Sequence, residues 1–260
     1  MMSKILSIIK VGGKVVEESS SLQRLLDDFV KLPGFKMLVH GGGRSATKIS
    51  EKLGIETKMV NGRRITDEET LKVVTMVYAG LVNKTIVASL QSKRCNAVGL
   101  SGADLDLIRA VKRPIVDIDY GFVGDVVSVQ TEEISKLISD GVVPVIAPLT
   151  HDGMGSMLNT NADTMASSLA CALASVFDVN LVYCFEKPGV MMNQNDNDSV
   201  IKSLDHPEFK KLQNDGIINE GMIPKLDNGF EAIHKGVKKV IITNTDGISG
   251  GNFKGTVLVN

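Results

Sequence analysis

Short runs of apolar residues alternate with amphipathic stretches along most of the 260-residue chain. The runs at 5–11 and 36–40 have the length of buried strands, and each is followed by a stretch with helical spacing, at 20–30 and 44–53. This alternation is typical of βαβ units, so the pattern predicts an α/β fold around a mostly parallel sheet. Further strands are predicted at 97–100, 142–147, 181–184, 237–243 and 255–259, and further helices at 66–91, 162–174 and 225–235.

Local signals refine these elements. Thr66 with Glu69, and Thr160 with Asp163, have the spacing of capping boxes at helix starts. The irregular, turn-rich region 107–129 predicts hairpins, and the spacing of the elements predicts a boundary between two lobes near 177–180.

Composition narrows the class of protein. The chain is 43% hydrophobic and 23% charged with a formal net charge of -1, which is ordinary for a soluble protein and indicates neither a nucleic-acid nor a membrane binder. No apolar run approaches the roughly 18 residues needed to cross a bilayer, so we expect a cytoplasmic protein. The cysteines and histidines are scattered, which indicates free thiols in a reducing compartment and no zinc site.

Two glycine clusters each follow a predicted strand, at 12–13 and 41–43. Glycines there let backbone N–H groups approach an anion, although tight turns would need the same residues. The sequence argues against a dinucleotide site, because the region about 20 positions after the second cluster is basic (Arg63 and Arg64) where an acidic residue is required. The GxxxxGK[ST] pattern of P-loop proteins is absent from the sequence.

Several charged residues stand where a bound anion would explain them. Lys10 ends an apolar strand, and Lys225 starts a helix, where the macrodipole favours anions. Arg63 and Arg64 lie in a loop and could clamp a carboxylate. Taken singly, each of these four side chains is equally explained as a solvated surface charge.

The order of these motifs resembles that of the acetylglutamate kinases, a branch of the amino-acid kinase family. The resemblance covers nearly the whole chain, and its most distinctive elements are Asn159-Thr-Asn-Ala-Asp163 and Gly221-Met-Ile-Pro-Lys225. It implies a three-layer αβα sandwich in two lobes, with residues 1–178 binding the N-acylglutamate and forming a homodimer, and residues 179–260 binding ATP. The implied cofactors are ATP and Mg²⁺, with no protein metal ligand.

The resemblance also implies residue roles. Lys10 and Lys225 would stabilise the transferring phosphoryl group, and Asp163 would orient both lysines. Substrate binding would fall to Gly42, Gly43, Arg64 and Asn159. The nucleotide would contact Gly12, Gly13, Asn161, Glu186, Lys187, Gly189, Ile217 and Asn219. The chain departs from the family at Phe185-Glu186, where Thr/Ser-Asp is usual, and at Glu220. Arginine-inhibited hexameric members of the family carry an extra N-terminal helix, and Lys10 lies too close to the start of the chain to leave room for it. A dimer without arginine feedback is therefore expected.

The implied chemistry suits the residues. A glutamate side-chain carboxylate has a pKa near 4.3, so the nucleophile is ionised at neutral pH and needs no general base. Catalysis would then rest on alignment and on neutralising phosphoryl charge. The alternatives are a related kinase acting on another substrate such as N-succinylglutamate, and a non-catalytic sensor of ATP or an amino acid.

Overall fold

The computed structural model describes residues 4–60, 62–218 and 221–260. The chain divides into two compact units, one made of residues 1–37 and 166–260 and the other of residues 38–165. These limits differ from the predicted lobe boundary at 178/179, which falls at the start of strand β11 (Asp178–Phe185) rather than in a linker. Lobes defined by what they bind need not coincide with compact units, so the ligand assignments of the lobes stay predictions.

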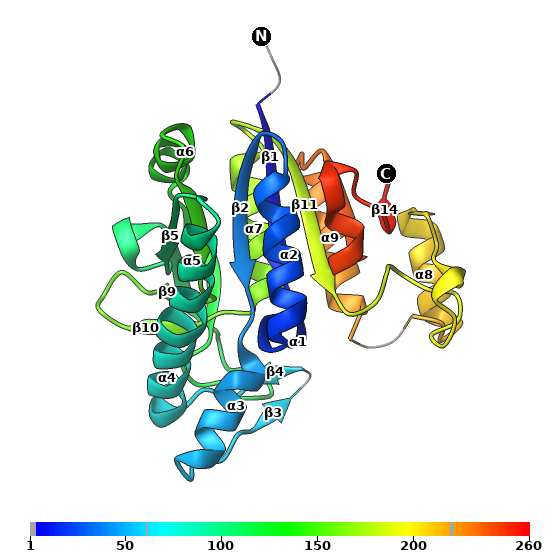
Figure 1. Cartoon of the computed structure of the whole chain (residues 1–260). Coiled ribbons are helices and arrows are strands. Elements are labelled where there is room, and N and C mark those ends of the chain that lie inside the picture. Colours follow the sequence, from blue (N-terminus) through cyan, green and yellow to red (C-terminus); the bar gives the residue numbers. More distant parts are fainter. Residues whose placement is uncertain (1–3, 61, 219–220) are drawn as a thin grey trace. The chain divides into compact units, whose positions relative to one another are not determined.

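The first unit is built on a mostly parallel sheet with the strand order β12-β14-β13-β11-β1 (Figure 1). All neighbours are parallel except β13 and β14. Every residue of β1 from Leu6 onward is buried, as expected for a parallel strand covered on both faces. The strands are β1 (Ile5–Val11), β11, β12 (Ser203–Leu204), β13 (Lys239–Asn244) and β14 (Thr256–Leu258).

Helices cover both faces of this sheet, which makes the three layers. Helix α2 buries Leu22, Leu25, Leu26 and Phe29, a single face at helical spacing, and Figure 1 shows it in front of β1 with α7 behind. Ser167 Oγ of α7 donates to Asn228 O of α9 at 3.2 Å, so these two helices lie together. The helices are α1 (Gly13–Glu17), α2 (Ser19–Lys31), α7 (Ala162–Leu173), α8 (His206–Asn214) and α9 (Ile223–His234), with 3₁₀ turns η3 (Asn197–Ser199) and η4 (Thr245–Gly251).

The second unit contains the parallel strands β2 (Phe35–His40, from Leu38 onward), β8 (Val143–Ile146) and β5 (Ala97–Leu100), in that order. Helix α3 (Gly43–Lys52) follows β2 directly, and α6 (Thr131–Ser139) precedes β8. A continuous helix of 25 residues, Glu68–Ser92, consists of α4 (Glu68–Thr75), a π-helical segment η1 (Met76–Val82) and α5 (Asn83–Ser92).

By length and composition alone this helix could cross a membrane, since it contains an 18-residue window with a mean hydropathy of 1.5. It is also a core helix, because Val73, Val74, Val77 and Ile86 are buried.

The N-terminal cap of this helix differs from the predicted one. Asp67, not Thr66, accepts the N–H of Thr70 (2.8 Å), and the Thr66 hydroxyl instead donates to Arg64 O.

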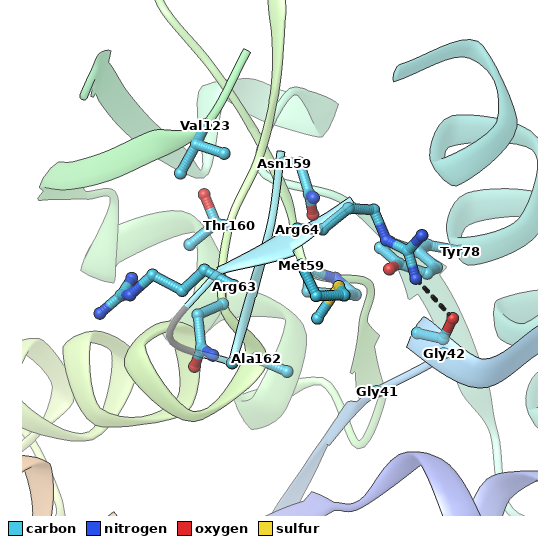
Figure 2. Close-up of a pocket in the computed structure, with 14 residues that line it drawn as sticks. Gly41, Gly42, Met59, Arg63, Arg64, Tyr78, Val123, Asn159, Thr160 and Ala162 are labelled. Atoms are coloured by element: carbon cyan, nitrogen blue, oxygen red, sulfur yellow. Dashed lines mark hydrogen bonds between the residues drawn. The ribbon is translucent and has the colours of Figure 1, made fainter. Parts of the chain in front are cut away.

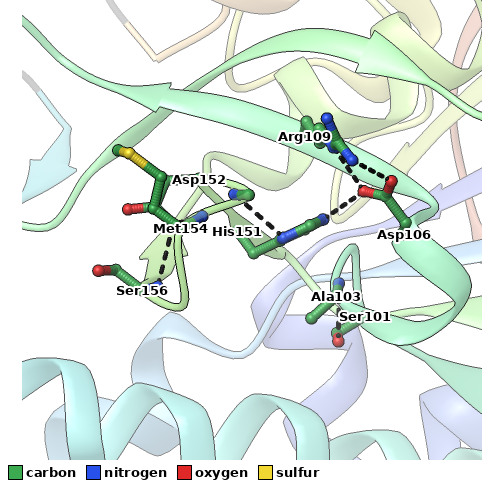
Figure 3. Close-up of polar contacts among 9 residues, drawn as sticks. Ser101, Ala103, Asp106, Arg109, His151, Asp152, Met154 and Ser156 are labelled. Atoms are coloured by element: carbon green, nitrogen blue, oxygen red, sulfur yellow. Dashed lines mark hydrogen bonds and ion pairs between the residues drawn. The ribbon is translucent and has the colours of Figure 1, made fainter.

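A smaller sheet, β10-β9-β6-β7, completes the second unit and confirms a hairpin within 107–129, since β6 and β7 pair antiparallel. Leu105 and Asp106, just before β6, both have positive φ. Figure 3 shows the contacts of the Asp106 side chain: Arg109 donates to both of its carboxylate oxygens, and His151 Nε2 lies 2.8 Å from its Oδ1. The strands are β6 (Ile108–Lys112), β7 (Gly124–Val129), β9 (Leu149–His151) and β10 (Met157–Asn159), preceded by the turn η2 (Asp104–Asp106) and the two-stranded hairpin β3 (Met59–Val60) and β4 (Arg63–Arg64).

The predicted α/β class with a mostly parallel sheet is confirmed. Helices α6 and α8 were not predicted, although α8 carries a start signal: Asp205 Oδ1 accepts the Glu208 N–H at 2.7 Å, with a proline in the first turn.

Candidate active site

A cavity of about 160 Å³ lies within the second unit (Figure 2). Glycine, amide and arginine groups form its polar walls, and a methionine, a tyrosine and a valine form its apolar walls. The lining residues are Gly41, Gly42, Gly43, Met59, Gly62, Arg63, Arg64, Tyr78, Val123, Pro148, Asn159, Thr160, Asn161 and Ala162. Five predicted site residues are therefore brought together in one cavity: Gly42, Gly43, Arg64, Asn159 and Asn161.

The glycine loop at 41–43 joins β2 to α3 and forms the N-terminus of that ten-residue helix, with Gly42 at the N-cap. Backbone N–H groups at a helix start favour an anion. A Cβ atom at Gly42 would lie 2.8 Å from Cδ1 of Tyr78, so only glycine lets the loop approach this ring. Burial raises the pKa of the Tyr78 hydroxyl, which stays neutral and presents a rigid wall.

Arg64 is buried in the wall beside this loop. Its Nη2 donates to Gly43 O (2.8 Å) and to Thr47 Oγ1 (2.8 Å), and its Nη1 donates to Thr57 Oγ1 (3.0 Å). The dashed line in Figure 2 marks the bond from Arg64 to the glycine loop. These contacts hold the guanidinium, so the cavity presents a preorganised positive charge.

Arg63 precedes it on β4, and Figure 2 shows the two guanidinium groups pointing to opposite sides of the strand, as strand alternation requires. Burial and the neighbouring Arg113 lower the pKa of Arg63, although an arginine still keeps its proton.

The segment from Asn159 to Ala162 also lines the cavity, and Asp163 follows it in the chain. Asn159 Nδ2 donates to Thr66 Oγ1 at 3.0 Å. The predicted capping box of Thr160 with Asp163 is wrong: Asn161 Oδ1 accepts the N–H groups of Asp163 (2.9 Å) and Thr164 (3.1 Å). The Thr160 hydroxyl bonds to Thr150 instead. Asp163 is buried in the first turn of α7, where a carboxylate suits the helix dipole.

Lys10, in the first unit, is buried at the carboxyl end of β1. The glycine loop that follows it is bonded to the neighbouring strand β11, because Gly12 N donates to Cys184 O at 2.9 Å. Gly13 opens helix α1.

Lys225 reaches the same edge of the sheet through topology. Strands β11 and β13 are parallel, and α9 lies between them in the chain, so α9 runs back and its N-terminus lies at their carboxyl ends. Lys225 stands in the first turn of α9, after Pro224. Both predicted phosphoryl-binding lysines are therefore placed at one edge of the first unit's sheet.

Three of the predicted nucleotide contacts, Glu186, Lys187 and Gly189, follow β11 at that edge. Glu186 Oε1 lies 4.0 Å from Lys14 Nζ, and Lys187 Nζ donates to Gln194 O at 3.0 Å. At Gly189 a Cβ atom would lie 2.7 Å from Thr256 Oγ1, so a side chain is excluded there. Ile217 lies just beyond α8, with its N–H bonded to Leu212 O. Asn219 and the atypical Glu220 lie outside the described residues.

Several cavity residues were missed from the sequence, notably Met59, Tyr78 and Val123. Tyr78 has the spacing of a core residue on the long helix, so its pattern gives no functional signal. Across residues 4–60, 62–218 and 221–260, no group of three or more His, Cys, Asp or Glu could hold a metal ion. None of the three cysteines forms a disulfide, and burial raises the pKa of Cys184 to about 12, which makes that thiol unreactive.

Comparison with known proteins identifies the family. The model of the amino acid kinase family matches residues 6–244. Acetylglutamate kinase of Phocaeicola vulgatus is 63% identical over 257 residues, covering 99% of each chain.

Among solved structures, smu.665 of Streptococcus mutans has a TM-score of 0.79 at 25% identity, covering 98% of each chain. N-acetylglutamate synthase of Neisseria gonorrhoeae, complexed with coenzyme A and N-acetyl-glutamate, has a TM-score of 0.85 at 20% identity, with all of this chain matched to 60% of that one; this second likeness concerns the fold alone. Kinases transfer a phosphoryl group from a nucleoside triphosphate, so family membership implies the use of ATP. The chain belongs to the amino acid kinase family, among its acetylglutamate kinases.

Proposed function

We propose that the chain transfers the γ-phosphoryl group of ATP to the side-chain carboxylate of N-acetyl-L-glutamate, forming an acyl phosphate in arginine biosynthesis. The observation that carries this proposal is the cavity itself, in which a buried arginine stands beside a glycine loop at a helix N-terminus. A substrate with an α-carboxylate and a second carboxylate offers an anion to each of these features. The name of the 63% identical relative supports the same substrate.

In the proposed reaction the substrate carboxylate is already ionised and attacks the γ-phosphorus, and the bond to the ADP oxygen breaks. Arg64 binds the α-carboxylate and Asn159 the acylamide. The N–H groups of Gly42 and Gly43 donate to oxygens of the transferred group, where charge must be stabilised. In the proposal Lys10 and Lys225 stabilise the remaining charge on the phosphoryl group, and Asp163 orients both lysines.

ATP would enter as its magnesium complex, with the ion bound largely by the phosphates and water, a mode that needs no cage of protein ligands. We assign the nucleotide to Gly12 and Gly13 after β1, to Glu186, Lys187 and Gly189 after β11, and to Ile217 beyond α8, with Asn161 near the phosphates.

A coupled ADP-release assay tests the activity. We expect turnover with N-acetylglutamate, and none with aspartate, carbamate or UMP at equal concentration. Binding of ATP without turnover on any of these acceptors would contradict the proposal and favour a sensor.

The identity of the acyl group needs a second acceptor in the same assay. Arg63 lines the cavity as a second guanidinium, directed away from Arg64, and could pair with a further carboxylate. This favours N-succinylglutamate as the alternative substrate. The ratio of kcat/KM for the two acylglutamates in the native chain and in Arg63→Gln decides: a succinyl preference that Arg63→Gln abolishes would establish the alternative.

Arg64→Lys should raise the KM for the acylglutamate about tenfold or more while kcat changes little. Lysine keeps the charge but loses the planar fork that the Thr47, Thr57 and Gly43 contacts hold in place, and a hydrogen bond to a charged group contributes about 1.5–3 kcal/mol. Steady-state kinetics at saturating ATP measure this. Arg24→Lys, on α2 of the other unit, is the matched control, and an unchanged KM in Arg64→Lys would remove Arg64 from substrate binding.

We further propose that the protein is a cytoplasmic homodimer. Met76 and Leu81 project from the long helix with exposed fractions of 56% and 57%, and large apolar side chains of this kind favour an interface. Light scattering of the native chain and of Leu81→Glu tests it: a native monomer contradicts the proposal.

A further inference from the structure

The glycine loop of the cavity is preceded by a histidine that the proposed reaction does not use. His40 ends strand β2 and is completely buried. Its Nδ1 lies 2.7 Å from Gly41 O, the first carbonyl of the loop, and its Nε2 lies 3.1 Å from Nδ2 of Asn83. Asn83 is itself buried and is the first residue after the π-helical segment.

The partners determine the protonation state of this ring. A carbonyl oxygen can only accept, so Nδ1 must carry the proton and donate to Gly41 O. Nε2 must then accept from the Asn83 amide, which also donates to Val145 O at 2.9 Å. Both ring nitrogens are satisfied by a neutral imidazole in a single tautomer. Burial agrees with this, because desolvation lowers the pKa of His40 to about 4.

The amide is oriented in its turn by a second set of contacts. Lys84 Nζ donates to Asn83 Oδ1 (3.2 Å) and to Gly99 O (2.8 Å). At Gly99 a Cβ atom would lie 1.8 Å from Asn83 Oδ1, so glycine is required there to make room for the amide. The chain of contacts therefore runs from strand β5 through Lys84 and Asn83 to His40 and ends on the glycine loop.

From these contacts we infer that His40, held in one tautomer by Asn83, is a positioning residue that aims the Gly42 and Gly43 N–H groups by fixing the Gly41 carbonyl. The inference rests on the proposed function, in which those N–H groups meet the transferring phosphoryl group. A loop whose first peptide can rotate would lose alignment in the transition state, while binding of either substrate would change little.

Two substitutions separate the two ring nitrogens. In His40→Asn the side-chain amide places an N–H donor near the position of Nδ1, so the bond to Gly41 O is kept and the bond from Asn83 is lost. In His40→Gln the longer amide can accept from Asn83 near Nε2, while no donor stands at Nδ1. We expect kcat to fall on the order of 10- to 100-fold in His40→Gln, with both KM values within about threefold of native, and to stay within about threefold in His40→Asn.

Thermal unfolding and amide hydrogen exchange complete the test. Exchange at the N–H groups of residues 41–43 should be faster in His40→Gln than in His40→Asn, whatever the relative melting temperatures. Equal kcat losses in the two variants, losses that follow the melting temperature, or equal exchange would each overturn the inference. If the native chain turns over no acylglutamate, the proposed function fails, and the exchange comparison still decides the role of His40.

Discussion

Replacing Lys10 by methionine is expected to lower kcat on the order of 10²- to 10³-fold and to leave the fold intact. The side chain is buried at the carboxyl end of β1, among apolar strand neighbours. Methionine keeps a comparable apolar stem and removes the ammonium group alone, so the loss reports the charge that the proposed reaction places on the phosphoryl oxygens. Lys225→Met should show a loss on the same scale, since both lysines lie at one edge of the sheet. Single-turnover kinetics with saturating ATP and acylglutamate measure the chemical step.

The control for both variants is Lys239→Met. Lys239 is an exposed lysine at the start of β13, at the opposite end of the parallel strands. Its replacement removes the same charge from the same unit and should leave kcat unchanged. A Lys10→Met or Lys225→Met enzyme that turns over like Lys239→Met would remove that lysine from the reaction.

Acidification should destabilise the native chain by about 3 kcal/mol through His40 alone. The pKa of His40 is lowered by burial to about 4 in the folded protein, against 6.5 for an unburied histidine. The unfolded chain therefore takes up this proton first as the pH falls. Stability is lost between about pH 6.5 and pH 4, and below pH 4 the residue contributes no further change because both states are protonated.

Urea denaturation at intervals from pH 7 to pH 4.5 measures this loss. The His40→Asn variant has no titrating group at the position, so its free energy of unfolding should decline less steeply over the same range. Comparing the two chains cancels the carboxylates that titrate in both, such as Asp67, whose pKa is lowered by its bond from the Thr70 N–H. Parallel declines in the two chains would show that the buried imidazole is not held neutral.

Much of the secondary structure could be predicted because the signals are local. The apolar run at 5–11 is a strand with the predicted limits, and the helix predicted at 20–30 is found as Ser19–Lys31. Parallel strands are buried on both faces, so a continuous apolar run identifies them without knowledge of their neighbours. Helix caps were less predictable. At 160–163 several polar residues compete for the same N–H groups, and in the folded chain Asn161 rather than Thr160 accepts them.

The sequence by itself determined the fold class, the glycine loops and the residues that resemble those of a known family, since these depend on residue type and order along the chain. Only the tertiary structure decided that Tyr78 would wall the cavity, that Thr47 and Thr57 would hold Arg64, and that Asn83 would meet His40. The physical reason is distance along the chain: His40 and Asn83 stand 43 residues apart, and the hydrogen bond between them exists only once the helix has packed on the strand.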